Sequence, residues 1–214
     1  MDTIELKEAL PQVFRDDPAP ESQIWLTDVE FRRPNLYMVA AESGKGKSSM
    51  CSYIYGNRND YMGQILFNGE DIRNYDIMRW SEIRRSHLAL LPQELRLFPE
   101  LSAMDNIRLK NRLTDFKTEE EILMMLDMLG IKHKANQLAA YLSVGQQQRV
   151  AIVRSLCQPF DFIMLDEPVS HLDAGNNRIA ADLIVEEAKR QQAGVITTSV
   201  GNHLALVDPI TLRL

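Results

Sequence analysis

Short apolar runs bounded by turn-forming residues recur along the chain and predict β-strands. The predicted strands cover residues 24–29, 36–41, 65–69, 88–91, 162–165, 195–198 and 210–212. The third of them ends in Asn68-Gly69, a dipeptide that indicates a hairpin turn. The polar, proline-containing stretch 16–21 predicts a loop. Strands are therefore expected in both halves of the chain, with a different pattern between them.

The middle of the chain shows helical rather than alternating spacing. Between residues 102 and 138 the apolar positions form one stripe, which comprises Ile122, Met125, Leu126 and Leu129. Thr118 and Glu121 stand ahead of it as a capping box. Further helices are expected from about residue 47 to 55, after Gly145 to about 156, and from 179 to 190. Strands that alternate with helices around a helical insert predict a mostly parallel sheet that carries an inserted helical subdomain.

Composition and charge narrow the class of protein. With 214 residues, the chain is long enough for one compact domain, or for a core with a modest insertion. It has 30 acidic and 24 basic residues, a formal charge of −6 and no long block of one sign. Because a nucleic-acid binder needs a basic stripe, nucleic acid is not an expected partner.

Cysteine usage and the lack of a long apolar segment favour a cytoplasmic protein. Cys51 and Cys157 are too few for a disulfide scaffold, and we expect both to be small buried residues in a reducing compartment. No window approaches the ~18 apolar residues of a membrane span. The first residues lack the basic and apolar regions of a signal peptide. We therefore expect membrane association only through a partner.

Residues 43–49 have the composition of a phosphate-binding loop. Gly46-Lys47-Ser48 matches the end of that pattern, whereas Ala41 stands where its first glycine belongs. In such a loop backbone N–H groups surround phosphate oxygens, the lysine reaches the terminal phosphates and the serine hydroxyl can ligate Mg²⁺. The positive end of the following helix adds to the attraction. The predicted nucleotide-binding residues are Ser43, Gly44, Lys45, Gly46, Lys47, Ser48 and Ser49.

An acidic pair, Asp166-Glu167, directly follows the apolar run 162–165. The carboxyl end of a strand is where open α/β sheets bind ligands. Phosphoryl transfer to water needs a carboxylate that holds Mg²⁺ and a second group that orients the attacking water. The alternative interpretation is a solvated acidic pair that begins a turn before Pro168.

Between the phosphate loop and the acidic pair lies Ser143-Val144-Gly145-Gln146. In this order, the three motifs resemble those of the nucleotide-binding subunits of ABC ATPases, and the resemblance covers most of the chain. The resemblance implies an α/β fold of the P-loop NTPase (RecA-like) type. This fold has a mostly parallel sheet core, a small antiparallel β part and an inserted α-helical subdomain. It also implies a single ABC ATPase domain, 1–214, with a nucleotide-binding core at 1–94 and 158–214 and a helical signature subdomain at 95–157.

The resemblance further implies roles for single residues around ATP and Mg²⁺. Asp166 and Ser48 would ligate the metal, and Glu167 would act as general base. Gln93 matches the Q-loop glutamine, a ligand of Mg²⁺ and water that also senses the membrane partner. Phe14 is the candidate that stacks on adenine; the alternatives, Phe31 and Trp25, are expected to pack against the sheet instead.

The signature motif implies a dimer. Ser143, Gly145 and Gln146 would meet the γ-phosphate of an ATP held by the opposite subunit, at a helix N-terminus. One chain cannot place both its phosphate loop and its signature motif on the same nucleotide. Two chains, arranged head to tail, would therefore enclose two ATP molecules. The stretch 170–173 resembles the D-loop at that seam, where we expect His171 to be a surface turn residue.

Three positions depart from the family pattern: Ala41, Val144 and Ser199. Ser199 stands where a histidine would contact the γ-phosphate and hold the water with Glu167. As a catalytic candidate, a serine can donate one hydrogen bond but has no positive charge. We expect His203 to be an ordinary helix-start residue; the alternative is that its side chain takes over the missing contact.

Three functions remain open. The first is an ATP-hydrolysing subunit that drives a separate integral-membrane permease together with a second ABC ATPase subunit, identical or different. Residues 93–107 resemble the stretch that subunits of the lipoprotein-releasing, macrolide-exporting and cell-division group present to a coupling helix. The second is an ATP-dependent switch or scaffold with little turnover, which the three departures favour. The third is an ABC ATPase of DNA repair or translation, which the lack of long coiled coils and paired cassettes disfavours.

Overall fold

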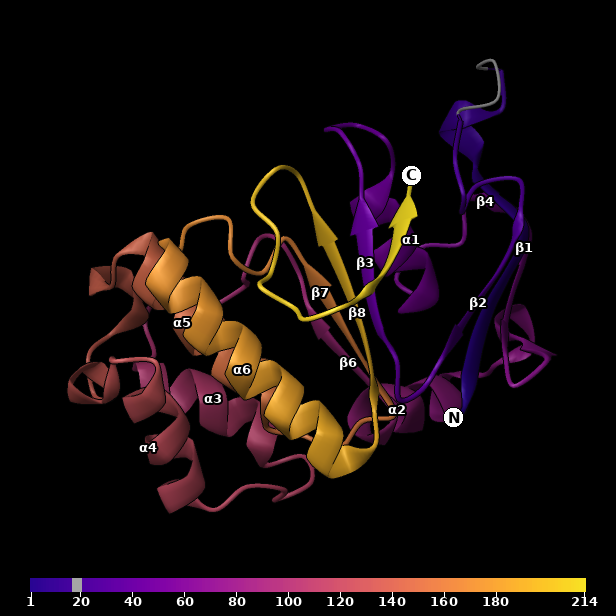
Figure 1. Cartoon of the computed structure of the whole chain (residues 1–214). Helices are drawn as coiled ribbons and strands as arrows, with labels where there is room; N and C mark the ends of the chain where they lie inside the picture. Colours follow the sequence, from indigo (N-terminus) through magenta and orange to yellow (C-terminus); the bar gives the residue numbers. More distant parts are fainter. Residues whose placement is uncertain (17–20) are drawn as a thin grey trace.

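The chain folds into two β-sheets with helices between and beside them (Figure 1). The computed structural model describes residues 1–16 and 21–214, so the predicted loop 16–21 lies mostly outside the described residues. The strands are β1 (Thr3–Pro11), β2 (Asp28–Arg32), β3 (Leu36–Ala40), β4 (Tyr61–Phe67), β5 (Glu70–Asp71), β6 (Leu88–Leu91), β7 (Phe162–Asp166), β8 (Gly194–Ser199) and β9 (Ile210–Arg213). The helices are α1 (Lys47–Ile54), α2 (Ile77–Ser86), α3 (Ala103–Asn111), α4 (Glu119–Met128), α5 (Val144–Leu156) and α6 (Ala174–Gln191), with short 3-10 turns η1 (Gln12–Phe14), η2 (Ile72–Asn74), η3 (Lys132–Lys134) and η4 (Ala139–Tyr141).

The central sheet is parallel, in the order β6-β7-β8-β3-β9. All five residues of β7 are buried. Ile163 and Leu165 join the core formed with the helices from α3 to α6, whereas Phe162 and Met164 join the core on the other face. Because both faces are covered, the strand is continuously apolar. The carboxyl ends of these strands meet at one edge of the sheet, which is where the candidate site lies.

The second sheet is antiparallel, in the order β2-β1-β4-β5. Side chains of α1, including Met50 and Ile54, share a core with Ile4 of β1 and Met164 of β7, so α1 lies between the two sheets. Figure 1 shows α3, α4 and α5 on the opposite side of the parallel sheet. No helix within residues 1–16 and 21–214 is long and apolar enough to cross a membrane.

Several local predictions are confirmed. The capping box of Thr118 and Glu121 begins α4, and Asn68-Gly69 joins the antiparallel strands β4 and β5. Asn68 and Gly69 have φ angles of 50° and 81°, as a tight hairpin turn requires. Cys51 and Cys157 are both buried free thiols. These features depend on residues close together in sequence.

The predicted strand at 24–29 is wrong for residues 24–27. Residues 24–27 form a turn, and β2 begins at Asp28. The Ser22 hydroxyl accepts hydrogen bonds from the backbone N–H groups of Ile24 (3.0 Å) and Trp25 (2.8 Å), and Leu26 has a φ of 56°. Local side-chain hydrogen bonds of this kind compete with a strand ladder. Ile24 and Trp25 are therefore buried as part of a turn and not as part of a strand.

Other boundaries differ from the prediction. The strand β1 and the helix α2 were not predicted, although β1 pairs with both β2 and β4. The helix α6 begins at Ala174, five residues ahead of the predicted 179, because the Asp173 side chain accepts from the N–H of Asn176 at 2.9 Å. The apolar pattern therefore missed the first five residues of the helix but gave its end to within one residue.

Candidate nucleotide-binding site

The loop between β3 and α1 has the backbone of a phosphate-binding loop. Gly44 and Gly46 adopt φ angles of 81° and 94°. A Cβ atom at Gly46 would lie 3.1 Å from Phe14 Cε2 and 3.2 Å from Trp25 Cζ2, so a side chain there would be strained by its φ and would require these rings to shift. Ala41, in place of the first glycine, does not adopt a positive φ. The alanine therefore introduces no backbone strain into the loop.

Lys47 closes this loop from the first turn of α1. Its side chain is 5% exposed, and its Nζ atom donates to the carbonyl oxygens of Ala41 (3.3 Å) and Glu42 (2.8 Å). The same atom lies 4.0 Å from Glu167 Oε1. Burial lowers the pKa of the Lys47 ammonium, while the carboxylates of Glu167 and Asp166 raise it. A cation is thus held at the carboxyl edge of the sheet, facing an acidic residue.

Gln93 joins the loop to the acidic pair. Its Nε2 donates to Glu167 Oε2 at 3.2 Å, and its Oε1 accepts from Ser48 Oγ at 3.4 Å. Asp166 is 5% exposed, and its Oδ1 accepts from Thr198 Oγ1 at 2.6 Å. The structure therefore brings together predicted residues from α1, from the segment after β6 and from the end of β7. It excludes the interpretation of Asp166 and Glu167 as a freely solvated acidic pair.

The oxygen atoms at this edge fit a magnesium ion. The Ser48 hydroxyl, the Gln93 amide and the Asp166 carboxylate are hard oxygen donors, which Mg²⁺ prefers. Within residues 1–16 and 21–214 no group of three or more His, Cys, Asp or Glu side chains could hold a metal ion. A metal here would thus need further oxygen ligands, and nucleotide phosphates supply them in sites of this kind.

The signature residues lie away from the phosphate loop. Ser143 caps α5, where its hydroxyl accepts from Gln146 N (3.3 Å) and its own N–H donates to Gln146 Oε1 (2.9 Å). Val144 is 50% exposed. A Cβ atom at Gly145 would lie 2.8 Å from the backbone oxygen of His171, so glycine is required by a close backbone approach. Since α5 packs on the opposite face of the sheet from α1, one chain does not bring these residues to its own loop (Figure 1).

Aromatic residues line the outer side of the phosphate loop. Phe14 is partly buried beside Gly46, as its short distance to that residue shows. Trp25 is 2% exposed and packs in the same core as Ile4 and Phe31 of the antiparallel sheet, as expected, while its Nε1 also donates to Lys45 O of the loop at 3.1 Å. Phe31 packs edge to face against Tyr37 in the core, as expected. Among the three candidates, Phe14 is the one that combines proximity to the loop with partial exposure.

Two further polar residues shape the site in ways that the sequence did not indicate. Gln148, which is 1% exposed, donates to Glu167 O at 3.1 Å and accepts from His171 N at 3.0 Å, so α5 supports the turn after the acidic pair. Glu167 itself has a left-handed φ of 52°. Arg58 is the second of these residues, because its Nη1 donates to the hydroxyl of Ser49 in the first turn of α1 at 3.2 Å.

The histidines differ in how well they were predicted. His171 is an exposed residue in the segment between β7 and α6, as expected. The prediction that His203 starts a helix is wrong, because residues 200–209 are irregular. His203 Nδ1 instead lies 2.5 Å from Ser199 Oγ. The two residues that were considered as alternatives for one contact are thus hydrogen-bonded to each other.

A glycine-bearing loop between a parallel strand and a helix, with a buried lysine facing carboxylates, defines a nucleotide-binding protein of the P-loop class. The chain belongs to the ABC transporter family: the sequence model of that family matches residues 27–170, more than half of the chain. Within the family it is an ATP-binding domain, since its curated relatives are ATP-binding proteins of ABC transporters.

Known proteins resemble this chain over most of its length. The lipoprotein-releasing system ATP-binding protein LolD of Shewanella denitrificans is 28% identical over 94% of this chain and 88% of its own. The dimeric structure of MJ0796, a bacterial ABC transporter cassette, matches with a TM-score of 0.75 at 24% identity, covering 91% of this chain and 87% of that one. The same cassette in a post-hydrolysis state bound to ADP and Pi matches with a TM-score of 0.74 at 25% identity, covering 92% and 87%.

Proposed function

We propose that this chain binds and hydrolyses ATP and, as one of two cassettes paired head to tail, powers a separate membrane permease. The observation that carries the proposal is the cluster at the carboxyl edge of the sheet. Lys47 lies 4.0 Å from Glu167, and Gln93 connects Glu167 to Ser48. The MJ0796 cassette, dimeric and known with ADP and Pi, supports the same activity for a chain of this fold.

Each residue of the cluster has a distinct task in the proposed reaction. The phosphate-loop N–H groups and Lys47 bind the β- and γ-phosphates, and Phe14 stacks on the adenine. Mg²⁺, held by Ser48, Asp166 and Gln93, neutralises charge on the phosphates when bound. Glu167 accepts the proton of the attacking water.

The departures from the family pattern give little support to a non-hydrolysing switch. Ala41 keeps a negative φ in the phosphate loop, and Val144 sits on the surface without distorting α5. Lys47, Asp166 and Glu167 are all present and converge. The transporter ATP-binding relatives also support transport rather than DNA repair.

A hollow whose lining includes Leu90, three residues before Gln93, is the proposed contact for the permease. It has a volume of about 260 Å³ and is lined by Leu90, Phe98, Asn106, Leu109, Lys110 and Arg154, from both the core and the helical region. Phe98 and Leu109 are 54% and 43% exposed, although both are large apolar residues. Exposed apolar side chains around a concave surface are typical of a protein contact. Through Gln93, a helix docked here would act on the ATP site.

The head-to-tail pairing predicts a strong effect of charge at Val144. With Mg²⁺ and a non-hydrolysable ATP analogue, the wild-type chain is expected to dimerise. The Val144→Glu chain is expected to remain a monomer, although its own phosphate loop still binds the nucleotide. The added carboxylate would face the γ-phosphate of the other subunit's nucleotide. Light scattering coupled to size-exclusion chromatography measures the molecular mass of each variant. The matched control, Val144→Gly, should dimerise at least as well as wild type, and dimerisation of Val144→Glu would contradict the proposed seam.

A further inference from the structure

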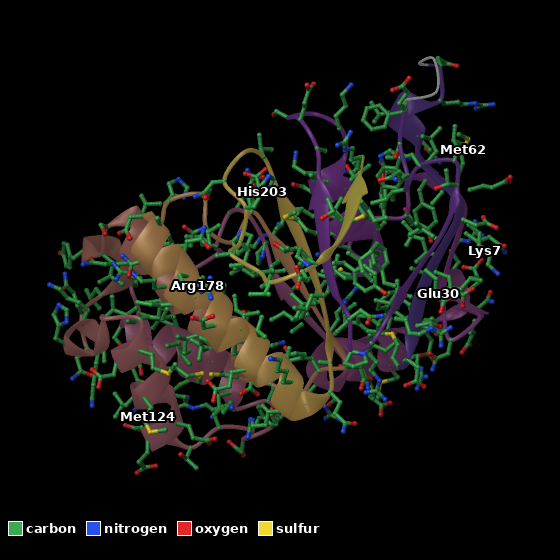
Figure 2. The ribbon with its side chains drawn as sticks, viewed as in Figure 1. Lys7, Glu30, Met62, Met124, Arg178 and His203 are labelled. Atoms are coloured by element: carbon green, nitrogen blue, oxygen red, sulfur yellow. The ribbon has the colours of Figure 1, made fainter. Side chains whose placement is uncertain are left out.

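The imidazole of His203 is hydrogen-bonded to the end of strand β8 in the central sheet, next to the phosphate loop. Ser199 ends β8, and its carbonyl oxygen accepts from Ala41 N at 3.4 Å. Its hydroxyl lies 2.5 Å from Nδ1 of His203. Figure 2 shows His203 beyond the carboxyl ends of the parallel strands. The pair therefore lies at the same edge as Asp166, whose register partner on β8 is Thr198.

Hydrogen bonds hold the segment that carries His203, both before and after this residue. Asn202 Nδ2 donates at 2.8 Å to the carbonyl oxygen of Val169, two residues after Glu167. Asn177 of α6, which is 6% exposed, donates to His203 O at 2.8 Å and accepts from Ala205 N at 3.0 Å. A side chain supported by a buried asparagine and a bonded loop is held in a defined place. The position of the imidazole is thus built into the fold.

His203 and the phosphate loop line the same hollow. It has a volume of about 440 Å³, and its walls include Ala41, Glu42, Lys45, Ser199 and His203. Ala41 and Glu42 are also the residues whose carbonyl oxygens bind Lys47. A terminal phosphate held by Lys47 would therefore lie near the part of the loop that His203 faces across this hollow.

The bond to Ser199 determines how the ring can act. Ser199 is 1% exposed, and among the described residues Nδ1 of His203 is the hydrogen-bond partner of its hydroxyl. We assign the proton of this bond to the Ser199 hydroxyl, which satisfies a buried donor, so that Nδ1 accepts. A neutral imidazole that accepts at Nδ1 carries its proton on Nε2. His203 is an exposed residue, so this second N–H is available to a phosphate oxygen.

We propose that His203 contacts the γ-phosphate of ATP and that Ser199 is the positioning residue that holds its ring. The strand end supplies a hydroxyl, and the imidazole comes from four residues further along the chain. The pair thus replaces a histidine at the strand end itself. The inference rests on the proposed ATPase function and deepens it, because it assigns the group that distinguishes ATP from ADP.

The test measures the affinities for ATP and ADP with Mg²⁺, by titration calorimetry in the Glu167→Gln chain, where turnover does not interfere. His203→Ala is expected to weaken ATP binding about tenfold, the effect of losing one hydrogen bond to a charged group. ADP binding should stay within about twofold, since ADP lacks the γ-phosphate. The control His133→Ala removes an exposed histidine of η3 and should change neither affinity.

A rescue variant separates this role from a merely structural one. Ser199→His combined with His203→Ala places the imidazole on the strand end and should restore the preference for ATP over ADP. Ser199→Ala should lose part of the preference, and adding His203→Ala to it should cost little more, because the two residues act as a unit.

The outcomes distinguish this inference from the proposed function. If His203→Ala keeps the wild-type ratio of ATP to ADP affinity, the inference is wrong while nucleotide binding stands. If the parent chain binds neither nucleotide, the proposed function and the inference both fail.

Discussion

Replacing Lys47 with alanine is expected to abolish tight ATP binding. The Lys47 ammonium is buried, joins two loop carbonyls and faces the carboxyl edge where the phosphates would lie. Loss of a charge-assisted contact to the terminal phosphates costs about 3 kcal/mol. That cost corresponds to roughly a 100-fold rise in the dissociation constant for ATP. Titration calorimetry with ATP measures this change directly.

The effect of Lys47→Ala can be separated from misfolding. The melting temperature of Lys47→Ala shows whether the variant is folded, since the substitution also removes the hydrogen bonds of Lys47 to Ala41 O and Glu42 O. Lys7→Ala, on the outer antiparallel sheet (Figure 2), removes a lysine remote from the site and should leave ATP affinity unchanged. Unchanged ATP affinity in Lys47→Ala would contradict the phosphate-loop assignment.

Glu167→Gln is expected to stop hydrolysis while ATP remains bound, so that a dimer with two trapped nucleotides accumulates. The Glu167 carboxylate accepts from Gln93 and faces Lys47. The amide keeps the shape and can still accept from Gln93, but it cannot take a proton from water. General-base catalysis contributes about 100-fold or more, so phosphate release should fall at least that far.

Light scattering with Mg²⁺-ATP measures the mass of the Glu167→Gln chain. The matched control is Glu186→Gln, which neutralises an exposed glutamate of α6 and should hydrolyse ATP like wild type. If the Glu167→Gln chain hydrolysed ATP at the wild-type rate, Glu167 would not be the general base. One that binds ATP but stays monomeric would contradict pairing of the isolated chains.

The proximity of Lys47 and Glu167 was predictable because Glu167 directly follows β7 and Lys47 begins the helix that follows β3. Lys47 and Glu167 are far apart in sequence, but each stands at the carboxyl end of a strand of the same parallel sheet. Parallel strands end at a shared edge, so strand order and motif order are enough to bring the two together. Capping boxes such as Thr118 with Glu121 were equally accessible, since all their contacts lie within one helical turn.

The errors concern residues whose conformation depends on hydrogen bonds to side chains, some of them distant in sequence. Trp25 lies in an apolar run but is placed by the Ser22 hydroxyl and by Lys45 O. His203 is placed by Ser199 and by Asn177 of another helix. Hydropathy at neighbouring positions has no information on such contacts, so the run 24–29 and the start of a helix at 203 were both predicted incorrectly.

The most direct test of the account is steady-state phosphate release by the purified wild-type chain with Mg²⁺-ATP, with Glu167→Gln as the blank. We expect release above the blank that disappears when EDTA removes Mg²⁺, because Ser48, Gln93 and Asp166 would act on the phosphates through the metal. Release equal to the blank, from a chain that binds ATP, would contradict the claim that this cassette is itself a working ATPase.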